Sequence, residues 1–138
     1  MKKYVLVQCC KTKRKEPRKF KACDLYISDL FNKSMAYAKS LSPDKIFILS
    51  AKYGLLEEED VIEDYNETLN TKSAPEIKEW SVKVLTSLSQ KTDLQTDKFI
   101  FLAGEKYRKY LIENIRNVCI PLKGLRIGKQ LAFYKENT

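Results

Sequence analysis

Four short segments of the chain consist almost entirely of apolar residues and are predicted to be strands. They cover residues 4–10 (YVLVQCC), 45–51 (KIFILSA), 98–103 (KFIFLA) and 118–122 (VCIPL). A continuous apolar run of this length, flanked by charged residues, is typical of a strand buried on both faces of a sheet. The last segment contains Pro121, which predicts an edge position or the end of the strand.

Between these segments, apolar residues recur every three or four positions, which predicts amphipathic helices. The first helix is expected to begin after an N-cap at Ser28 and the second at Pro75, the third to span residues 105–116 and the fourth to begin near Gly128. Strands that alternate with helices favour β-α-β units. We therefore predict a single α/β domain over residues 1–138, a Rossmann-like three-layer sandwich with a mostly parallel sheet of about four strands in the order 2-1-3-4.

The composition is typical of a folded protein, with 43% hydrophobic and 32% charged residues in 138. No apolar run reaches the roughly 18 residues needed to cross a bilayer. The apolar run after the N-terminus stops at Gln8, which is too short for the core of a signal peptide. We expect a cytoplasmic protein without a membrane span.

The sequence contains no histidine, which excludes Ser-His and Cys-His pairs as catalytic groups. The four cysteines lack the close ligand pairs of structural zinc sites, so no metal site is predicted. Neither G-x-G-x-x-G nor a phosphate-binding P-loop is present, and the sequence does not define a cofactor.

The net charge of +8 favours an anionic partner, either a nucleotide, a modified base or a nucleic acid. The charge is uneven along the chain. Residues 11–21 (KTKRKEPRKFK) contain seven Lys or Arg and one Glu, whereas residues 57–64 (EEEDVIED) contain six acids. The basic segment is either a phosphate-binding element or a solvated loop. The sequence leaves the oligomeric state open.

The candidate site lies in the loops that follow the predicted strands, namely residues 9–13, 50–56, 104–108 and 123–130. In open parallel sheets, ligands bind beyond the carboxyl ends of the strands. All four glycines of the chain fall in these loops, where a tight turn or a close approach to a ligand favours glycine.

The candidate residues divide by chemistry. Cys9 or Lys52 is the candidate nucleophile, since a lysine just beyond a buried strand can be desolvated, and Glu63 or Asp64 is the candidate acid or base. Lys52 is alternatively an anion-binding residue or the partner of a structural ion pair, and the tyrosines are alternatively core residues. The residues predicted to bind a ligand are basic groups for phosphate, tyrosines for stacking, and small or polar groups of the loops: Lys11, Lys13, Arg108, Tyr53, Tyr65, Tyr107, Ser50, Gly104, Gly128 and Gln130.

Six segments resemble a bacterial, archaeal and phage family of small domains of unknown function. They are CCKTK (9–13), DLYISDLFNKSMAYA (24–38), ILSAKYGLL (48–56), VIEDYNETLN (61–70), FLAGEKYRKYL (101–111) and PLKGLRIGKQLAF (121–133). CCKTK, SAKYGLL and EDYN are also distantly similar to motifs in the core domain of archaeosine synthase, which acts on a deazaguanine base in tRNA. This resemblance implies a pocket for a modified purine.

Together these features predict a nucleobase- or nucleotide-directed enzyme of nucleic-acid base modification, with its pocket at the carboxyl ends of the strands. The alternative is a non-catalytic nucleic-acid-binding module that uses the basic loop 11–21. A scaffold or accessory subunit is a third reading. The sequence does not decide whether the chain is an enzyme.

Overall fold

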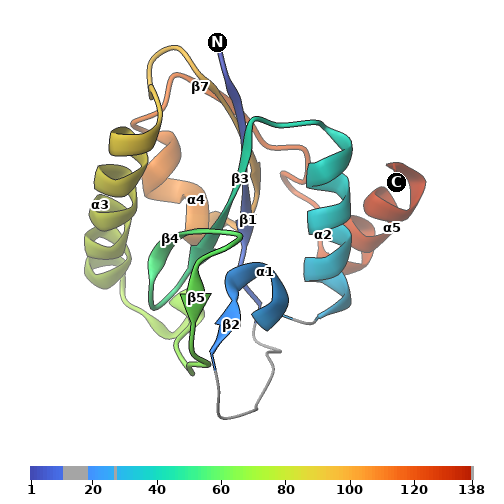
Figure 1. Cartoon of the computed structure of the whole chain (residues 1–138), viewed down its shortest axis with the longest axis horizontal. Helices are drawn as coiled ribbons and strands as arrows, with labels where there is room; N and C mark the ends of the chain where they lie inside the picture. Colours follow the sequence, from blue (N-terminus) through green and yellow to red (C-terminus); the bar gives the residue numbers. More distant parts are fainter. Residues whose placement is uncertain (11–18, 27, 138) are drawn as a thin grey trace.

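The computed structural model describes residues 1–10, 19–26 and 28–137. Within this part of the chain, five strands form one sheet in the order β4-β3-β1-β6-β7 (Figure 1). Neighbouring strands run parallel, except that β4 is antiparallel to β3. The strands are β1 (Lys3–Gln8), β3 (Lys45–Ser50), β4 (Gly54–Glu57), β6 (Lys98–Leu102) and β7 (Asn117–Cys119).

The four predicted strands are all present, and β3-β1-β6-β7 is the predicted order 2-1-3-4. The sheet has five strands instead of the predicted four or so, because residues 50–56, which the sequence predicts to be a loop, contribute to a further strand. They form a tight turn and most of β4, which pairs back onto β3 from Ser50↔Gly54 to Phe47↔Glu57. Gly54 makes the turn possible, since its φ of 77° lies in the left-handed region that disfavours residues with a Cβ.

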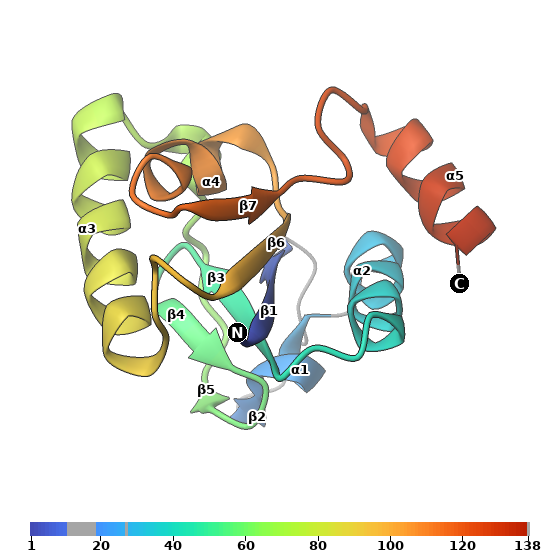
Figure 2. The same cartoon turned by 90° about the horizontal axis from the view of Figure 1, so that it is seen from above.

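Helices lie on both sides of the sheet. Figure 2 shows α2 (Asp29–Ser40) and α5 (Ile127–Asn137) on one side, and α3 (Ala74–Lys91) and α4 (Glu105–Ile112) on the other. Helix α2 contacts β1, and α5 packs against α2 rather than on the sheet. Helix α2, which follows β1 in the chain, therefore lies on one face, and α4, which follows β6, lies on the opposite face.

Two of the helices start at caps that the sequence contains. The Ser28 Oγ accepts a hydrogen bond from the Phe31 backbone N–H at 3.1 Å, as its predicted N-cap role requires. Helix α3 begins at a capping box, in which Ser73 and Glu76 each accept a backbone hydrogen bond from the other. Pro75 lies in the first turn of α3, where its missing N–H leaves no helical bond unmade.

Short elements that were not predicted gather at the carboxyl ends of the parallel strands (Figure 1). Strands β2 (Phe20–Lys21) and β5 (Val61–Ile62) form a small antiparallel ribbon. Helix α1 (Ala22–Leu25) follows β2, and a 3-10 turn, η1 (Leu69–Thr71), precedes α3. These pieces are too short to produce a hydrophobic period.

The last residue of β4, Glu57, which begins the acidic segment 57–64, takes part in holding the sheet to α3. The Glu57 carboxylate forms ion pairs with Lys45 on β3 at 2.6 Å and with Lys91 on α3 at 2.7 Å. Hydrogen bonds from these two lysines lower the pKa of Glu57 below its ordinary value. This acid is therefore a structural ion-pair partner.

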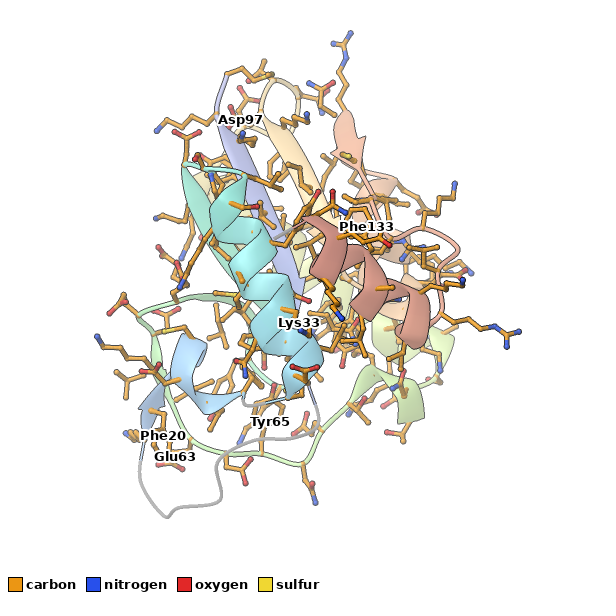
Figure 3. The ribbon with its side chains drawn as sticks, turned by 90° about the vertical axis from the view of Figure 1, so that its right-hand side faces the viewer. Phe20, Lys33, Glu63, Tyr65, Asp97 and Phe133 are labelled. Carbon is orange, nitrogen blue, oxygen red and sulfur yellow. The ribbon has the colours of Figure 1, made fainter. Side chains whose placement is uncertain are left out.

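At the opposite end of the sheet, Asp97 attaches the start of the chain through hydrogen bonds. Figure 3 shows Asp97 at the end of the molecule away from Glu63 and Tyr65. Its two carboxylate oxygens accept hydrogen bonds from the backbone N–H groups of Lys2 and Asp93, both at 2.9 Å. Those bonds, with Asp93 the larger cause, lower the pKa of Asp97. The contact holds the start of the chain beside β6.

We expect Gly54→Ala to lower the free energy of unfolding by about 1–2 kcal/mol, because alanine is strained at positive φ. A Cβ at Gly54 would lie 3.7 Å from Val84 Cγ2, which is an ordinary contact, so the loss reflects backbone strain alone. Gly128→Ala is the matched control. A Cβ there meets nothing within 4 Å, and alanine in helix α5 should add about 0.5–1 kcal/mol. Urea denaturation measures both, and equal stability of Gly54→Ala and wild type would contradict the expected strain.

Candidate functional site

The crevice between the carboxyl ends of β1 and β6 is the candidate site. These strands are neighbours, and the helices that come after them, α2 and α4, lie on opposite faces of the sheet (Figure 2). Ligands of open α/β sheets bind at such a switch point, because the two connections part and leave a crevice between them. The predicted location at the carboxyl ends of the strands corresponds to this place.

Gln8 and Gly104 join the two sides of the crevice. The Gln8 Oε1, at the end of β1, accepts a hydrogen bond from the Gly104 backbone N–H at 2.7 Å. Gly104 is the N-cap of α4. A Cβ at Gly104 would lie 3.1 Å from this same oxygen, so the close approach favours glycine here. Gln8 was not predicted as a site residue, although a polar residue that ends a buried strand was a visible signal.

A first hollow, which we call the glutamine pocket, lies between α2, α5 and the ends of β1 and β6. Its volume is about 190 Å³. Gln8, Cys9 and Gly104 line it from the sheet side, and Gln130 lines it from α5. The Gln130 Nε2 donates to the Leu125 carbonyl oxygen at 2.8 Å, which fixes the orientation of its amide. The structure thus brings three predicted residues, Cys9, Gly104 and Gln130, to one cavity.

A second hollow, the lysine pocket, lies between the start of α3 and α4. Its volume is about 520 Å³, and it is lined by Lys72, Lys106 and Lys109, with Tyr110 and Asn70 among its other walls. The Lys106 Nζ donates to the Asn70 carbonyl oxygen at 3.2 Å across the pocket, and the Lys109 Nζ lies 5.6 Å from the centre of the Tyr110 ring. Gln8 and Gly104 also line this pocket, so the two hollows meet at that pair.

A third hollow of about 500 Å³, the hairpin pocket, lies between the β3-β4 turn and α3. Lys52 and Tyr53 line it, together with Trp80, and with Lys52 included its walls carry three acidic and three basic side chains. Lys52 is exposed, and its Nζ lies 5.3 Å from the centre of the Tyr53 ring. The burial that would favour Lys52 as a nucleophile is therefore not found.

Beneath these hollows lies a buried hydrogen-bonded cluster. The Ser50 hydroxyl donates to the Tyr65 hydroxyl at 2.8 Å and accepts from the Tyr53 backbone N–H at 3.0 Å. The Tyr65 and Tyr26 hydroxyls are bonded at 2.5 Å, and the Trp80 indole N–H donates to the Ser50 carbonyl oxygen. Ser50 and Tyr65 thus support the site from below, since both are buried and line none of the three hollows.

A second buried contact joins Cys9 to Tyr107. The Cys9 Sγ donates to the Tyr107 hydroxyl at 3.7 Å, and the same hydroxyl accepts from the Leu69 backbone N–H at 3.3 Å. Tyr107 also stands edge-on to Trp80, with ring centres 5.6 Å apart. Tyr107 therefore connects the Cys9 thiol of the glutamine pocket with the 3-10 turn beside the lysine pocket.

Burial raises the pKa of each of Tyr26, Tyr65 and Tyr107 well above its ordinary value, because the phenolate would lose its hydration. The nearby Cys9 raises all three further. The hydroxyls are therefore neutral hydrogen-bonding groups at neutral pH and are unsuited to act there as general bases.

The remaining predicted residues that the structure describes line none of the three hollows. Glu63 is exposed, and its carbonyl oxygen accepts from the Tyr53 hydroxyl at 3.5 Å. Asp64 is half-buried and accepts from the Tyr65 backbone N–H. The Arg108 guanidinium donates to the Ala103 carbonyl oxygen at 2.7 Å. Gly128 is exposed near the start of α5.

Two predictions concern residues outside the described ranges. Lys11 and Lys13, predicted to bind phosphate, fall there, as does most of the basic segment 11–21.

Over residues 1–10, 19–26 and 28–137, no group of three or more Cys, Asp or Glu side chains is placed to hold a metal ion. None of the helices in the same ranges is long and apolar enough to cross a membrane.

The fold and the crevice define a mixed α/β protein with a mostly parallel sheet and candidate ligand pockets at the strand ends. A family model described as a family of unknown function, DUF6884, matches residues 4–136. The chain belongs to this family, which confirms the predicted membership in a family of unknown function. No curated protein matches the sequence. The similarity to archaeosine synthase stays a prediction.

We expect Tyr65→Phe to lower the free energy of unfolding by about 1–3 kcal/mol, since Ser50 and Tyr26 each lose a buried hydrogen-bond partner. Tyr53→Phe is the matched control. Tyr53 is exposed, and within the described residues its hydroxyl makes only the 3.5 Å contact with the Glu63 carbonyl oxygen, so the stability of the variant should stay within about 0.5 kcal/mol of wild type. Urea denaturation compares the two, and equal losses would show that the buried bonds contribute nothing specific.

Stability should also fall above pH 10. The unfolded chain releases its phenolic protons near that pH, whereas the raised pKa of Tyr65 keeps its proton on the folded protein. The stabilisation that Tyr65 contributes to the folded protein is thus fully present below pH 10 and is lost progressively as the pH rises further. In Tyr65→Phe the decline between pH 10 and 11 should be shallower by up to about 1.4 kcal/mol per pH unit. Parallel declines in variant and wild type would contradict this assignment.

Proposed function

We propose that the protein is a nucleobase- or nucleotide-directed enzyme whose ligand occupies the crevice between β1 and β6. The observation that carries the proposal is the meeting of two hollows at Gln8 and Gly104, one small and partly apolar, the other larger and rich in lysine. A nucleotide has the same division, with a flat ring at one end and phosphate at the other.

The lysine pocket suits the phosphate. Lys72, Lys106 and Lys109 supply three positive charges against one acid, Glu105, among its lining residues. Ammonium groups bind phosphate oxygens through charge-assisted hydrogen bonds, which are about twice as strong as neutral ones. The half-buried Tyr110 ring adds an aromatic wall between the lysines.

The candidate catalytic group is Cys9. Cys9 lines the glutamine pocket, and its thiol is hydrogen-bonded to Tyr107, which lines the lysine pocket, so Cys9 lies at the junction of the two parts of the proposed site. Lys52 and Tyr53 belong to the separate hairpin pocket, and Glu63 is exposed, so these residues have a weaker claim. The distant likeness of CCKTK and SAKYGLL to archaeosine synthase motifs supports a modified purine, a deazapurine, as the base.

We further propose that the architecture is a Rossmann-like three-layer sandwich, which supports a ligand at the switch point. The support is the helix pair on each side of the sheet (Figure 2). In sheets of this arrangement, ligands bind in the crevice where neighbouring strands are followed by helices on opposite faces. The arrangement also agrees with a cytoplasmic protein that handles nucleotides.

The test is a binding panel of nucleoside monophosphates, nucleosides, free bases including a deazaguanine, and short oligonucleotides, read by thermal shift and calorimetry. We expect one monophosphate to bind, and the double variant Lys106→Ala/Lys109→Ala to weaken it about tenfold or more, since two phosphate contacts are lost. Lys39→Ala/Lys135→Ala removes the same charge from exposed positions that line no hollow, and should leave the affinity within about twofold.

Two outcomes would reject the proposal. In the first, no base, nucleoside or monophosphate binds. In the second, only oligonucleotides bind, with an affinity that falls steeply with salt and is unaffected by the Lys106/Lys109 change. The second outcome would favour the non-catalytic module that uses the basic loop 11–21.

A further inference from the structure

Two glutamines of the crevice are each oriented by one hydrogen bond to the backbone. The Gly104 N–H can only donate, so the atom of Gln8 that faces it is the amide oxygen. The Leu125 carbonyl can only accept, so the atom of Gln130 that faces it is the amide nitrogen. The oxygen and nitrogen of each amide are therefore assigned by its hydrogen bond, which also identifies the second, unbonded atom of each amide.

The remaining ends are a donor and an acceptor. The Gln8 Nε2 and the Gln130 Oε1 make no hydrogen bond to any residue in the described part of the chain. Both side chains line the glutamine pocket, Gln8 from the end of β1 and Gln130 from the first turn of α5. An amide group that lacks a protein partner in a cavity keeps its hydrogen-bonding capacity for a ligand.

The other walls of this pocket suit a flat ring. Leu30 and Phe31 line it from α2, and Ile127 lines it from α5. Its volume of about 190 Å³ is below the roughly 300 Å³ at which pockets for drug-sized ligands begin, so it fits a ring system rather than a whole nucleotide. The lysine pocket adjoins it at Gln8 and Gly104, where the sugar and phosphate of the same ligand would lie.

Helix α5 holds the acceptor in place through aromatic contacts with α2. The Tyr37 ring lies 5.3 Å from Phe133 and 5.6 Å from Tyr134, measured between ring centres. Since α5 packs on α2 rather than on the sheet, these rings determine how far Gln130 stands from Gln8.

We propose that Gln8 and Gln130 read the hydrogen-bonding edge of a nucleobase in the glutamine pocket. The Gln8 amide donates to a ring carbonyl or ring nitrogen, and the Gln130 oxygen accepts from an adjacent N–H or amino group. Every common base carries such an acceptor beside a donor on its Watson–Crick edge, and proteins commonly read that edge in a pocket. This inference rests on the proposed function and specifies which residues choose the base.

The first test is Gln8→Glu, measured by calorimetry with nucleosides, which lack the phosphate that the lysine pocket would bind. A glutamate keeps one oxygen for the Gly104 N–H and presents a second oxygen where the wild-type protein presents a donor. We expect the preferred nucleoside of the wild type to bind about tenfold more weakly or worse, with the order of preference among bases changed. Gln90→Glu, at an exposed position of α3, adds the same charge and should change neither.

The second test is Gln130→Leu, which removes the acceptor without adding charge. It should lower the affinity for the preferred nucleoside about tenfold and leave the affinity for ribose 5-phosphate, which has no base, unchanged. Thermal unfolding without ligand confirms that the variant is folded. If both glutamine variants bind the preferred nucleoside as tightly as wild type, the base-reading role is overturned, while loss of monophosphate binding in Lys106→Ala/Lys109→Ala would still uphold the proposed function. If no base or nucleotide binds the wild-type protein, both fail.

Discussion

The requirement that buried polar groups find partners organises the carboxyl end of this sheet around Ser50. The residue ends β3 with its side chain fully buried, and the serine hydroxyl binds the Tyr65 hydroxyl and the backbone of the hairpin turn. The Ser50 carbonyl accepts from Trp80 on α3, and Tyr65 extends the cluster to Tyr26 beyond α1. A hairpin, a long loop and two helices, distant in sequence, are thereby held to one strand end. The cost of leaving any of these groups unpaired is what holds the short, weakly specified elements in place.

The sequence was sufficient to predict those elements whose structure depends on nearby residues alone. Long apolar runs identified the parallel strands, and Ser28 and Pro75 marked helix starts that depend only on nearby residues. The antiparallel strand β4 was missed because Leu55 and Leu56 are too few to give a period, and only the positive φ at Gly54 turns them back onto β3. The two-residue strands β2 and β5 likewise depend on tertiary contacts, through the buried Phe20 and Ile62, rather than on their own propensity.

The sequence indicated where a candidate site would lie but not how its residues are arranged. The rule for parallel sheets pointed to the strand ends, and Cys9, Gly104 and Gln130 line one hollow there. Which loop residues turn inward depends on contacts that no sequence period encodes. Ser50 and Tyr65 support the floor instead of lining a cavity. Conversely, the lysines of α4 look like an ordinary solvated helix face until α3 is placed opposite them.

The attachment of the chain start by Asp97 has a practical consequence for handling the molecule. Lys2 is bound at the amino ends of the strands, and Met1 beside it is exposed. An affinity tag or a biosensor linker joined before Met1 would therefore leave from the far end of the sheet and keep the crevice open to solution. A tether beyond α5 would instead pull on the helix that carries Ile127 and Gln130, two walls of the glutamine pocket. Immobilisation through the amino end is thus the geometry that leaves the candidate site undisturbed.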